Sequence, residues 1–341
     1  MIDFSRTESP LTIRQRKIFL ITLFGCIITL LISLFFGSYN ISFESFLNNS
    51  LSSIEKEVLF NIRFPRVIFS IFVGAALSLS GACLQGLFRN PLADPGLIGV
   101  SAGAALGAAT AIVVGNSLFT KYILSSFFVP ISAVIGSAIT IILLLILTKG
   151  FGKSSIIYLL LAGIAINAFA GVGIGILTYI SDDSELRGLS FWTMGSFGGV
   201  QWITILPSVT ILTLCFLWIL RLSKKLDIIQ LGEIEAFNLG IDTEKLKLEI
   251  IISSAIIVGV SVSLVGMIGF VGLIVPHIVR MMGGPNHKYV LYNSLMLGGL
   301  IMILADLISR NLISPAELPV GLITSAIGSP FFIWLIYKVR K

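Results

Sequence analysis

The sequence contains little charge. Only 12% of its 341 residues are Asp, Glu, Lys or Arg, whereas 56% are apolar, and the mean hydropathy is +1.01. A soluble domain carries roughly a quarter charged residues, and a soluble core of this length cannot hide so much apolar surface. The composition therefore excludes a soluble globular protein and indicates that most of the chain lies in lipid.

Cysteine is also scarce. Cys26, Cys83 and Cys215 lie far apart inside apolar runs and lack metal-ligand spacing, so we expect buried thiols and no disulfide. The net charge of +6 comes from Lys and Arg scattered between apolar runs, which does not favour nucleic-acid binding. The first apolar run, 18–36, is too long for a typical signal peptide and has no small-residue cleavage site after it, so it is read as a retained helix.

The sequence has no recognisable catalytic or metal-binding constellation. GFGKSS at 150–155 ends like a phosphate loop, but Leu147 occupies the position of the first glycine and a membrane helix precedes it. GVGIG at 171–175 lacks the last glycine of a dinucleotide fingerprint. His277 and His287 have no partner ligands at suitable spacing, and His277 is interpreted as a hydrogen-bonded structural residue. We expect no nucleotide hydrolysis, no resident metal, no bound cofactor and no enzymatic activity in this chain.

Ten apolar segments approach the length of about 20 residues that a membrane-crossing helix needs. We predict an all-α integral membrane protein that forms one transmembrane domain over residues 1–341. The predicted spans are 18–36, 64–85, 97–114, 123–148, 156–179, 205–222, 250–267, 270–282, 290–308 and 320–337. The eighth span is short and contains Pro276.

The basic residues predict the orientation of these spans. With the N-terminus in the cytoplasm, 17 of the 23 Lys and Arg residues fall in inner loops or inner ends, and six fall outside. This distribution obeys the positive-inside rule. Both termini are therefore predicted to be cytoplasmic.

The inner polar stretch 223–247 is longer than a simple turn requires. Gly232 and Gly240 interrupt a mixture of acidic and apolar residues, which predicts one or two short helices broken by glycine. Two interpretations remain open for it: a solvated connection, or a docking surface for a cytoplasmic partner.

Several polar and small residues within the spans call for an explanation. Asn167 either lines a polar path or hydrogen-bonds a neighbouring helix. Asp306 and Arg310 are spaced to form an ion pair on one helix. Arg63 and Arg66 carry positive charge at the outer mouth of the second span, where they contact either lipid headgroups or an acidic partner. Glycines repeat every four residues at 99, 103 and 107 and at 171 and 175, a spacing typical of helix packing in membranes.

Five long segments, in order, resemble the permease subunits of binding-protein-dependent ABC importers for iron-siderophores, heme and cobalamin. The segments are RFPRVIFSIFVGAALSLSGACLQGLFRNPLADPGLIGVSAGA at 63–104, FWTMGSF at 191–197, LGEIEAFNLGI at 231–241, GFVGLIVPHIVR at 269–280 and ELPVGLITSAIGSPFFIWLIYK at 317–338.

The resemblance implies a type II ABC importer permease with ten helices, in the bacterial cytoplasmic (inner) membrane. It implies a homodimer around one path, two cytoplasmic ATPase subunits that hydrolyse the ATP, and an extracytoplasmic substrate-binding protein. Alternating access between outward-open and inward-open states is the implied mechanism.

The resemblance also implies roles for individual residues. Arg63, Arg66 and Arg310 match positions that dock the binding protein. The fifth and tenth spans would line the translocation path, with Asn167 on the fifth. Asn90 and Leu92 match the inner gate, and Ser154, Ser155, Ile156 and Ile157 replace a more polar gate segment. Contact with the ATPases falls on Leu231, Gly232, Glu233, Glu235, Ala236, Leu239 and Gly240.

The segment RNPLADPGLIGVSAGA looks most similar to heme permeases, with siderophore and cobalamin permeases as the alternatives. An ion-coupled secondary transporter is another possible class, but such a protein is expected to keep ionisable residues near the bilayer midplane. Asp306, near a helix end, is the only acidic residue in the predicted spans. We therefore expect a heme or siderophore permease.

Overall fold

The computed structural model describes residues 12–37, 39, 41–118, 125–148 and 156–339, and all regular secondary structure within them is helical. Each predicted span corresponds to one helix. These helices are α1 (Ile13–Phe35), α4 (Phe64–Leu87), α5 (Val100–Leu118), α6 (Ser125–Thr148), α7 (Ile156–Ile180), α9 (Trp202–Leu220), α12 (Thr243–Val265), α13 (Val271–Gly283), α14 (His287–Asn311) and α15 (Val320–Val339).

Seven helices in the described part of the chain are long and apolar enough to cross a membrane, and three shorter apolar helices accompany them within α5, α13 and α15. With 13 residues, α13 extends only about 20 Å, less than the roughly 30 Å of bilayer hydrocarbon. It packs against α4 and α14, so neighbouring helices bury much of it. The eighth predicted span is thus an apolar helix too short to cross alone.

The outer polar stretch 37–63 is more helical than its composition suggested. It contains α2 (Phe43–Leu47), α3 (Ser53–Glu57) and the π-helical turn η2 (Val58–Arg63), which runs directly into α4. A capping box formed by Ser52 and Glu55 starts this continuous helix well before Phe64. The π-helical turn ends two residues before Pro65, whose missing N–H removes one α-helical hydrogen bond. Arg63 and Arg66 therefore lie within a continuous helix.

A further helix, α8 (Asp183–Met194), was not predicted. It lies in the connection between α7 and α9 and begins with a capping box formed by Asp182 and Glu185. Its mixed polar composition resembles that of a loop, which is why the search for apolar runs passed over it.

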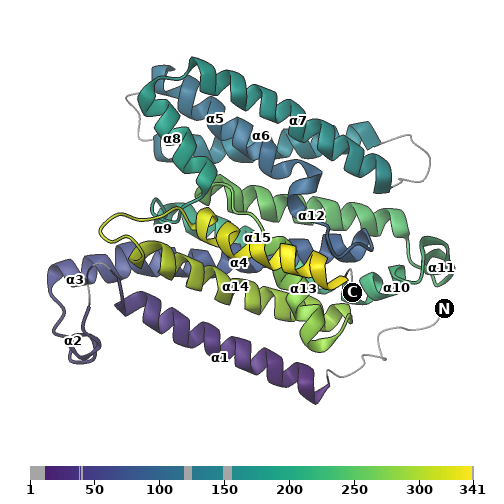
Figure 1. Ribbon diagram of the computed structural model, residues 1–341, viewed down its shortest axis with the longest axis horizontal. Coiled ribbons are helices and arrows are strands. Elements are labelled where there is room, and N and C mark those ends of the chain that lie inside the picture. Colours follow the sequence, from purple (N-terminus) through teal and green to yellow (C-terminus); the bar gives the residue numbers. More distant parts are fainter. Residues whose placement is uncertain (1–11, 38, 40, 119–124, 149–155, 340–341) are drawn as a thin grey trace.

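Glycine contacts hold the centre of the bundle together. A β-carbon at Gly74 of α4 would lie 2.2 Å from the carbonyl oxygen of Gly298 on α14, and one at Gly81 would lie 1.8 Å from that of Gly272 on α13. Close backbone approach of this kind is a main source of packing energy in lipid. In Figure 1, α4 and α12 lie between the group of α5, α6 and α7 on one side and the pair α1 and α14 on the other.

The two predicted glycine repeats differ in whether they pack against another helix of this chain. Gly103 and Gly107 lie directly against α6, since β-carbons there would meet Thr140 Oγ1 at 1.9 Å and the Ser132 carbonyl oxygen at 2.1 Å. Gly171 and Gly175 of α7 have no described atom within 4 Å of such a β-carbon. The first repeat packs two helices of this chain together, and the second does not.

The two ends of the bundle differ. The start of α1 and the end of α15 lie on the same side as α10 (Ser223–Ile229) and α11 (Glu233–Asn238), while α2, α3 and α8 lie at the opposite end (Figure 1). This arrangement agrees with termini that share one face with the inner polar stretch. The pair of short helices around Gly232 confirms the structure predicted for that stretch.

Candidate functional sites at the two ends of the bundle

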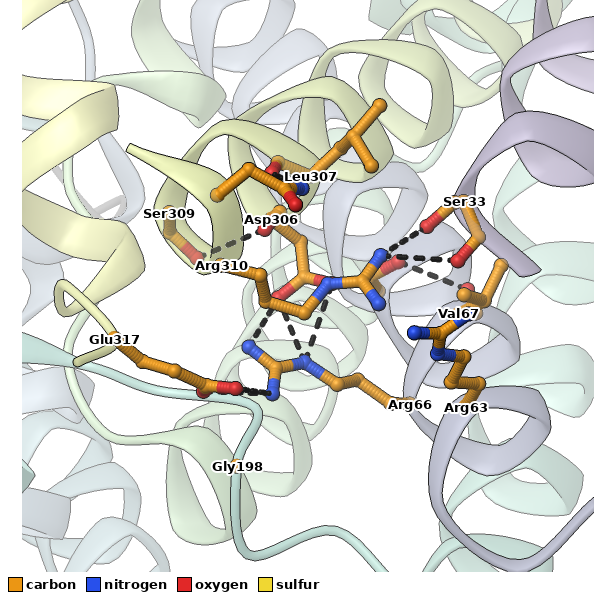
Figure 2. Close-up of polar contacts among 12 residues, drawn as sticks. Ser33, Arg63, Arg66, Val67, Gly198, Asp306, Leu307, Ser309, Arg310 and Glu317 are labelled. Carbon is orange, nitrogen blue, oxygen red and sulfur yellow. Dashed lines mark hydrogen bonds and ion pairs between the residues drawn. The ribbon is translucent and has the colours of Figure 1, made fainter. Parts of the chain in front are cut away.

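At the outer end, Arg66 of α4 lies between two carboxylates (Figure 2). Its Nη2 is 2.9 Å from Asp306 Oδ1, and its Nη1 is 2.7 Å from Glu317 Oε2. Asp306 is fully buried on α14, whereas the side chain of Glu317, in the connection to α15, is 41% exposed. Only the Glu317 side of Arg66 is thus close to the outer surface.

The other two outer arginines are also buried. Arg310 forms the predicted ion pair with Asp306, at 3.2 Å between Nε and Oδ2, and its Nη2 contacts the hydroxyl group of Ser33 on α1 (Figure 2). Arg63 donates to the carbonyl oxygens of Leu34, at 2.8 Å, and Tyr39. Arg63, Arg66 and Arg310 are each no more than 6% exposed. The structure brings the three predicted arginines to one end of the bundle but uses them in internal bonds.

At the inner end, α11 presents an apolar surface. The side chains of Ile234 and Phe237 are 74% and 69% exposed, and Leu231 and Leu239 are also exposed. Ala236 is buried beneath them. Exposed apolar groups clustered on a short surface helix indicate a protein contact. Ile234 and Phe237 were missed in the sequence, although their three-residue spacing within a polar stretch marks one helix face.

Glycine and one ion pair fix the position of α11. Gly232 has φ +128°, a conformation that favours glycine, and separates α10 from α11. Glu233 at the start of α11 accepts from Lys247 of α12 at 2.7 Å. Lys247 is itself 4% exposed and also contacts Glu244. A buried ammonium group of this kind needs paired carboxylates, so α11 is tied to the inner end of α12.

The loop after α4 contains the predicted gate residues. Asn90 Oδ1 accepts from the N–H of Leu92 at 2.9 Å, and Leu92 is exposed. Asp94 caps the short helix η3 (Pro95–Ile98) by accepting from the N–H of Gly96. Burial raises the pKa of Asp94, and the hydrogen bond from Gly96 opposes that shift. The predicted gate segment 154–155 and the turn 150–155 lie outside the described residues.

Asn167 hydrogen-bonds to this loop. Its Nδ2 donates to the carbonyl oxygen of Gly96 at 3.1 Å, and a β-carbon at Gly163, one turn earlier on α7, would meet the Leu97 carbonyl oxygen at 2.1 Å. Of the two interpretations left open by the sequence, the bond to a neighbouring element is the one observed. The bond joins α7 to the loop that carries Asn90 and Leu92.

The match that decides the family covers nearly the whole chain. Residues 25–338 match the FecCD transport family. The chain belongs to this family. It is 44% identical to the hemin transport system permease protein HmuU of Yersinia pestis, over 93% of this chain and 96% of that protein. It is 38% identical to the vitamin B12 import system permease protein BtuC of Klebsiella pneumoniae, over 96% and 95% of the two chains.

A solved structure supports the same assignment. An inward-facing conformation of an ABC transporter of the metal-chelate type superposes on this chain with a TM-score of 0.84 and 35% sequence identity, covering 95% of this chain and 99% of the other. The FecCD-family chain is therefore a multi-pass permease subunit of an ABC importer in the bacterial inner membrane. Such permeases work with a substrate-binding protein and with separate ATPase subunits, which use the ATP.

Proposed function

We propose that this FecCD-family permease moves an iron chelate, with heme as the first candidate, inward across the membrane as a homodimer. The observation that carries the substrate class is the 44% identity to a hemin permease over almost the full length of both proteins. The exposed apolar surface of α11 supports the transport mechanism, because it provides a contact through which cytoplasmic ATPases can act on the bundle.

In this proposal, the segment from Leu231 to Gly240 couples the permease to the ATPases. Ile234, Phe237, Leu231 and Leu239 contact the partner, and Ala236 packs inward. Gly232 and the Glu233–Lys247 pair fix the direction of α11 relative to α12. Closure of the ATPases on ATP then moves α11 together with the membrane helices, which switch between outward-open and inward-open states.

At the outer end, we assign docking of the binding protein to Arg63, Arg66 and Arg310, although all three are buried and already bonded within the chain. Asp306 already neutralises the buried sides of Arg66 and Arg310. The exposed Glu317 occupies the outer side of Arg66. A carboxylate of the binding protein can reach Arg66 only by replacing Glu317, and such an exchange preserves a charge-assisted pair throughout docking.

The proposed dimer encloses the path between copies of α7 and α15. No described atom lies within 4 Å of a β-carbon at Gly171 or Gly175 of α7, and Phe169 and Val172 beside them are exposed. A face of small residues that no described helix of this chain covers is suited to close approach by a second copy. The inner end of this path would be gated by Asn90 and Leu92.

A competition experiment tests the substrate. The permease is reconstituted in proteoliposomes with its ATPases and binding protein, and uptake of labelled hemin is measured against excess unlabelled hemin, ferric siderophore or cobalamin. Heme transport predicts strong competition by hemin alone. If labelled hemin is not taken up while labelled cobalamin is, the second candidate is supported instead, which is favoured by the 38% identity to a vitamin B12 permease.

A further inference from the structure

A buried histidine joins α10 to the membrane helices. His287, the first residue of α14, is 3% exposed. Its ring Nδ1 lies 2.7 Å from Asp227 Oδ1 on α10, and its backbone N–H donates to the same oxygen at 2.8 Å. A carboxylate only accepts hydrogen bonds, so Nδ1 carries the proton in this contact. One aspartate of the inner segment thus holds both the side chain and the backbone at the start of α14.

The opposite side of the histidine ring lies against α4. A β-carbon at Gly86 would lie 2.5 Å from His287 Nε2 and 3.2 Å from Cδ2 of Leu226 on α10. Gln230, at the end of α10, donates to the carbonyl oxygen of Gly86 at 2.7 Å. The ring therefore fills the space where α4, α10 and α14 meet, and any other side chain at Gly86 would displace it.

These contacts lie directly before the exposed helix α11. Only Gln230, Leu231 and Gly232 separate α10 from α11. The segment 223–238 is thus anchored to α14 and α4 through its first helix, and to α12 through the Glu233–Lys247 pair.

The helices reached through His287 also carry charged residues of the outer end, Arg66 on α4 and Asp306 and Arg310 on α14. The 25 residues of α14 extend about 37 Å, with His287 at one end and Asp306 and Arg310 near the other. The helix α4 likewise has Arg66 near its outer end and Gly86, which lies against His287, near its inner end. The glycine contact between Gly74 and Gly298 packs these two helices closely. The contacts of α10 therefore reach two tightly packed helices that extend to the opposite surface.

We infer that His287, bonded to Asp227 and seated against Gly86, is a positioning residue that transmits movement of the α10–α11 segment to α4 and α14. This inference rests on the proposed coupling function of that segment. His287 acts through its neighbours and contacts no substrate. Loss of its ring nitrogen should leave the ATPases bound to α11 while the membrane helices follow their movement less closely.

The test uses the full complex in proteoliposomes and compares His287→Leu, which removes the donor, with His287→Asn, which keeps an N–H donor near the position of Nδ1. Tyr292→Phe, an exposed position on the same helix, is the matched control. We expect His287→Leu to lower the substrate transported per ATP hydrolysed by at least about fivefold, the lower end of typical coupling between sites. ATPase co-purification should stay normal, and His287→Asn should restore much of the ratio.

A second measurement does not depend on transport. Hydrogen exchange of the amides in 223–238 should accelerate in His287→Leu and in Asp227→Asn, but not in Tyr292→Phe. Unchanged exchange in both variants would overturn the inference, as would a normal transport-to-ATP ratio or a loss that His287→Asn does not relieve. If the wild-type complex shows no ATP-dependent uptake, the proposed function fails, and the exchange measurement still decides whether His287 anchors α10.

Discussion

At the scale of single residues, Asp306 supports the outer end of the bundle. Its fully buried carboxylate is paired with both Arg66 and Arg310. Removing one member of a buried ion pair leaves an uncompensated charge and costs about 3–5 kcal/mol. We therefore expect Asp306→Asn to lower the free energy of unfolding by that amount, measured by thermal or denaturant unfolding in detergent micelles. Glu44→Gln, at an exposed outer position, is the control and should change stability little.

The second residue-scale prediction concerns docking. Glu317→Gln should strengthen binding of the substrate-binding protein, because it frees the outer side of Arg66 from a competing carboxylate. Arg66→Glu combined with Arg63→Glu should weaken it. Affinity is measured by pull-down and by surface binding at low and high salt, since charge pairing is screened by salt.

Lys56→Glu is the control for docking, since it reverses an exposed outer charge that is not one of the three assigned arginines. Docking that is unchanged by both Glu317→Gln and the arginine double variant at low salt would remove the assigned role. ATPase assembly at the other end should be normal in Glu317→Gln, because the Glu317 side chain is partly exposed, so this variant separates docking from loss of the fold.

At the scale of elements, the pair α4 and α14 depends on backbone contact. A β-carbon at Gly298 would lie 2.1 Å from the Ser78 hydroxyl oxygen and 2.4 Å from the Gly74 carbonyl oxygen. Overpacking of this kind typically costs 1–3 kcal/mol, so Gly298→Ala should lower the unfolding free energy by about that amount. Gly269→Ala is the control, because no described atom lies within 4 Å of its β-carbon. Equal unfolding free energies of Gly298→Ala and Gly269→Ala would show that α4 and α14 can move apart at little free-energy cost.

A second element-scale prediction concerns α11. Gly232→Val places a branched side chain at φ +128° and against Glu235, while Glu233→Gln removes the charged partner of Lys247. Both changes should lower transport per ATP hydrolysed, measured in proteoliposomes. Asp242→Asn retains the oxygen that caps α12 and should behave like the wild type. Normal coupling in both test variants would count against the role assigned to α11.

Helices were predictable from sequence where local signals were strong, and contacts between distant segments were not. Apolar length located ten helices, and glycines located the break between α10 and α11. The Arg66–Glu317 and His287–Asp227 contacts join residues 251 and 60 positions apart, so no local pattern could indicate them. Arg63 and Arg66 looked exposed because the capping box at Ser52 that extends their helix lies in a polar stretch. The Asp306–Arg310 pair was predictable because helix geometry alone brings its members together.

At the scale of the whole molecule, a substitution on the uncovered face of α7 tests the proposed dimer. Gly171→Leu should weaken self-association, because it fills a face proposed to meet the second copy, without lowering the stability of the separated protomer. The measurement is energy transfer between labelled permeases in a bilayer, with Tyr292→Phe as the control. Unchanged self-association of Gly171→Leu would place the dimer contact elsewhere.

In the proposed complex, the outer end of the bundle, with its charged residues, faces the binding protein. The inner end, with the exposed apolar surface of α11, faces the ATPases. In FecCD-family importers ATP is used by the partner subunits, and we propose that this permease contributes the path. Its movements are therefore expected only when both ends are engaged. This dependence distinguishes the importer from a transporter driven by an ion gradient.

The most direct test is hemin uptake by proteoliposomes in which one component is omitted at a time. The account predicts uptake only when the permease, ATPases, binding protein and ATP are all present, and no uptake with an imposed proton or sodium gradient in place of ATP. Uptake by the permease alone under an ion gradient would contradict it.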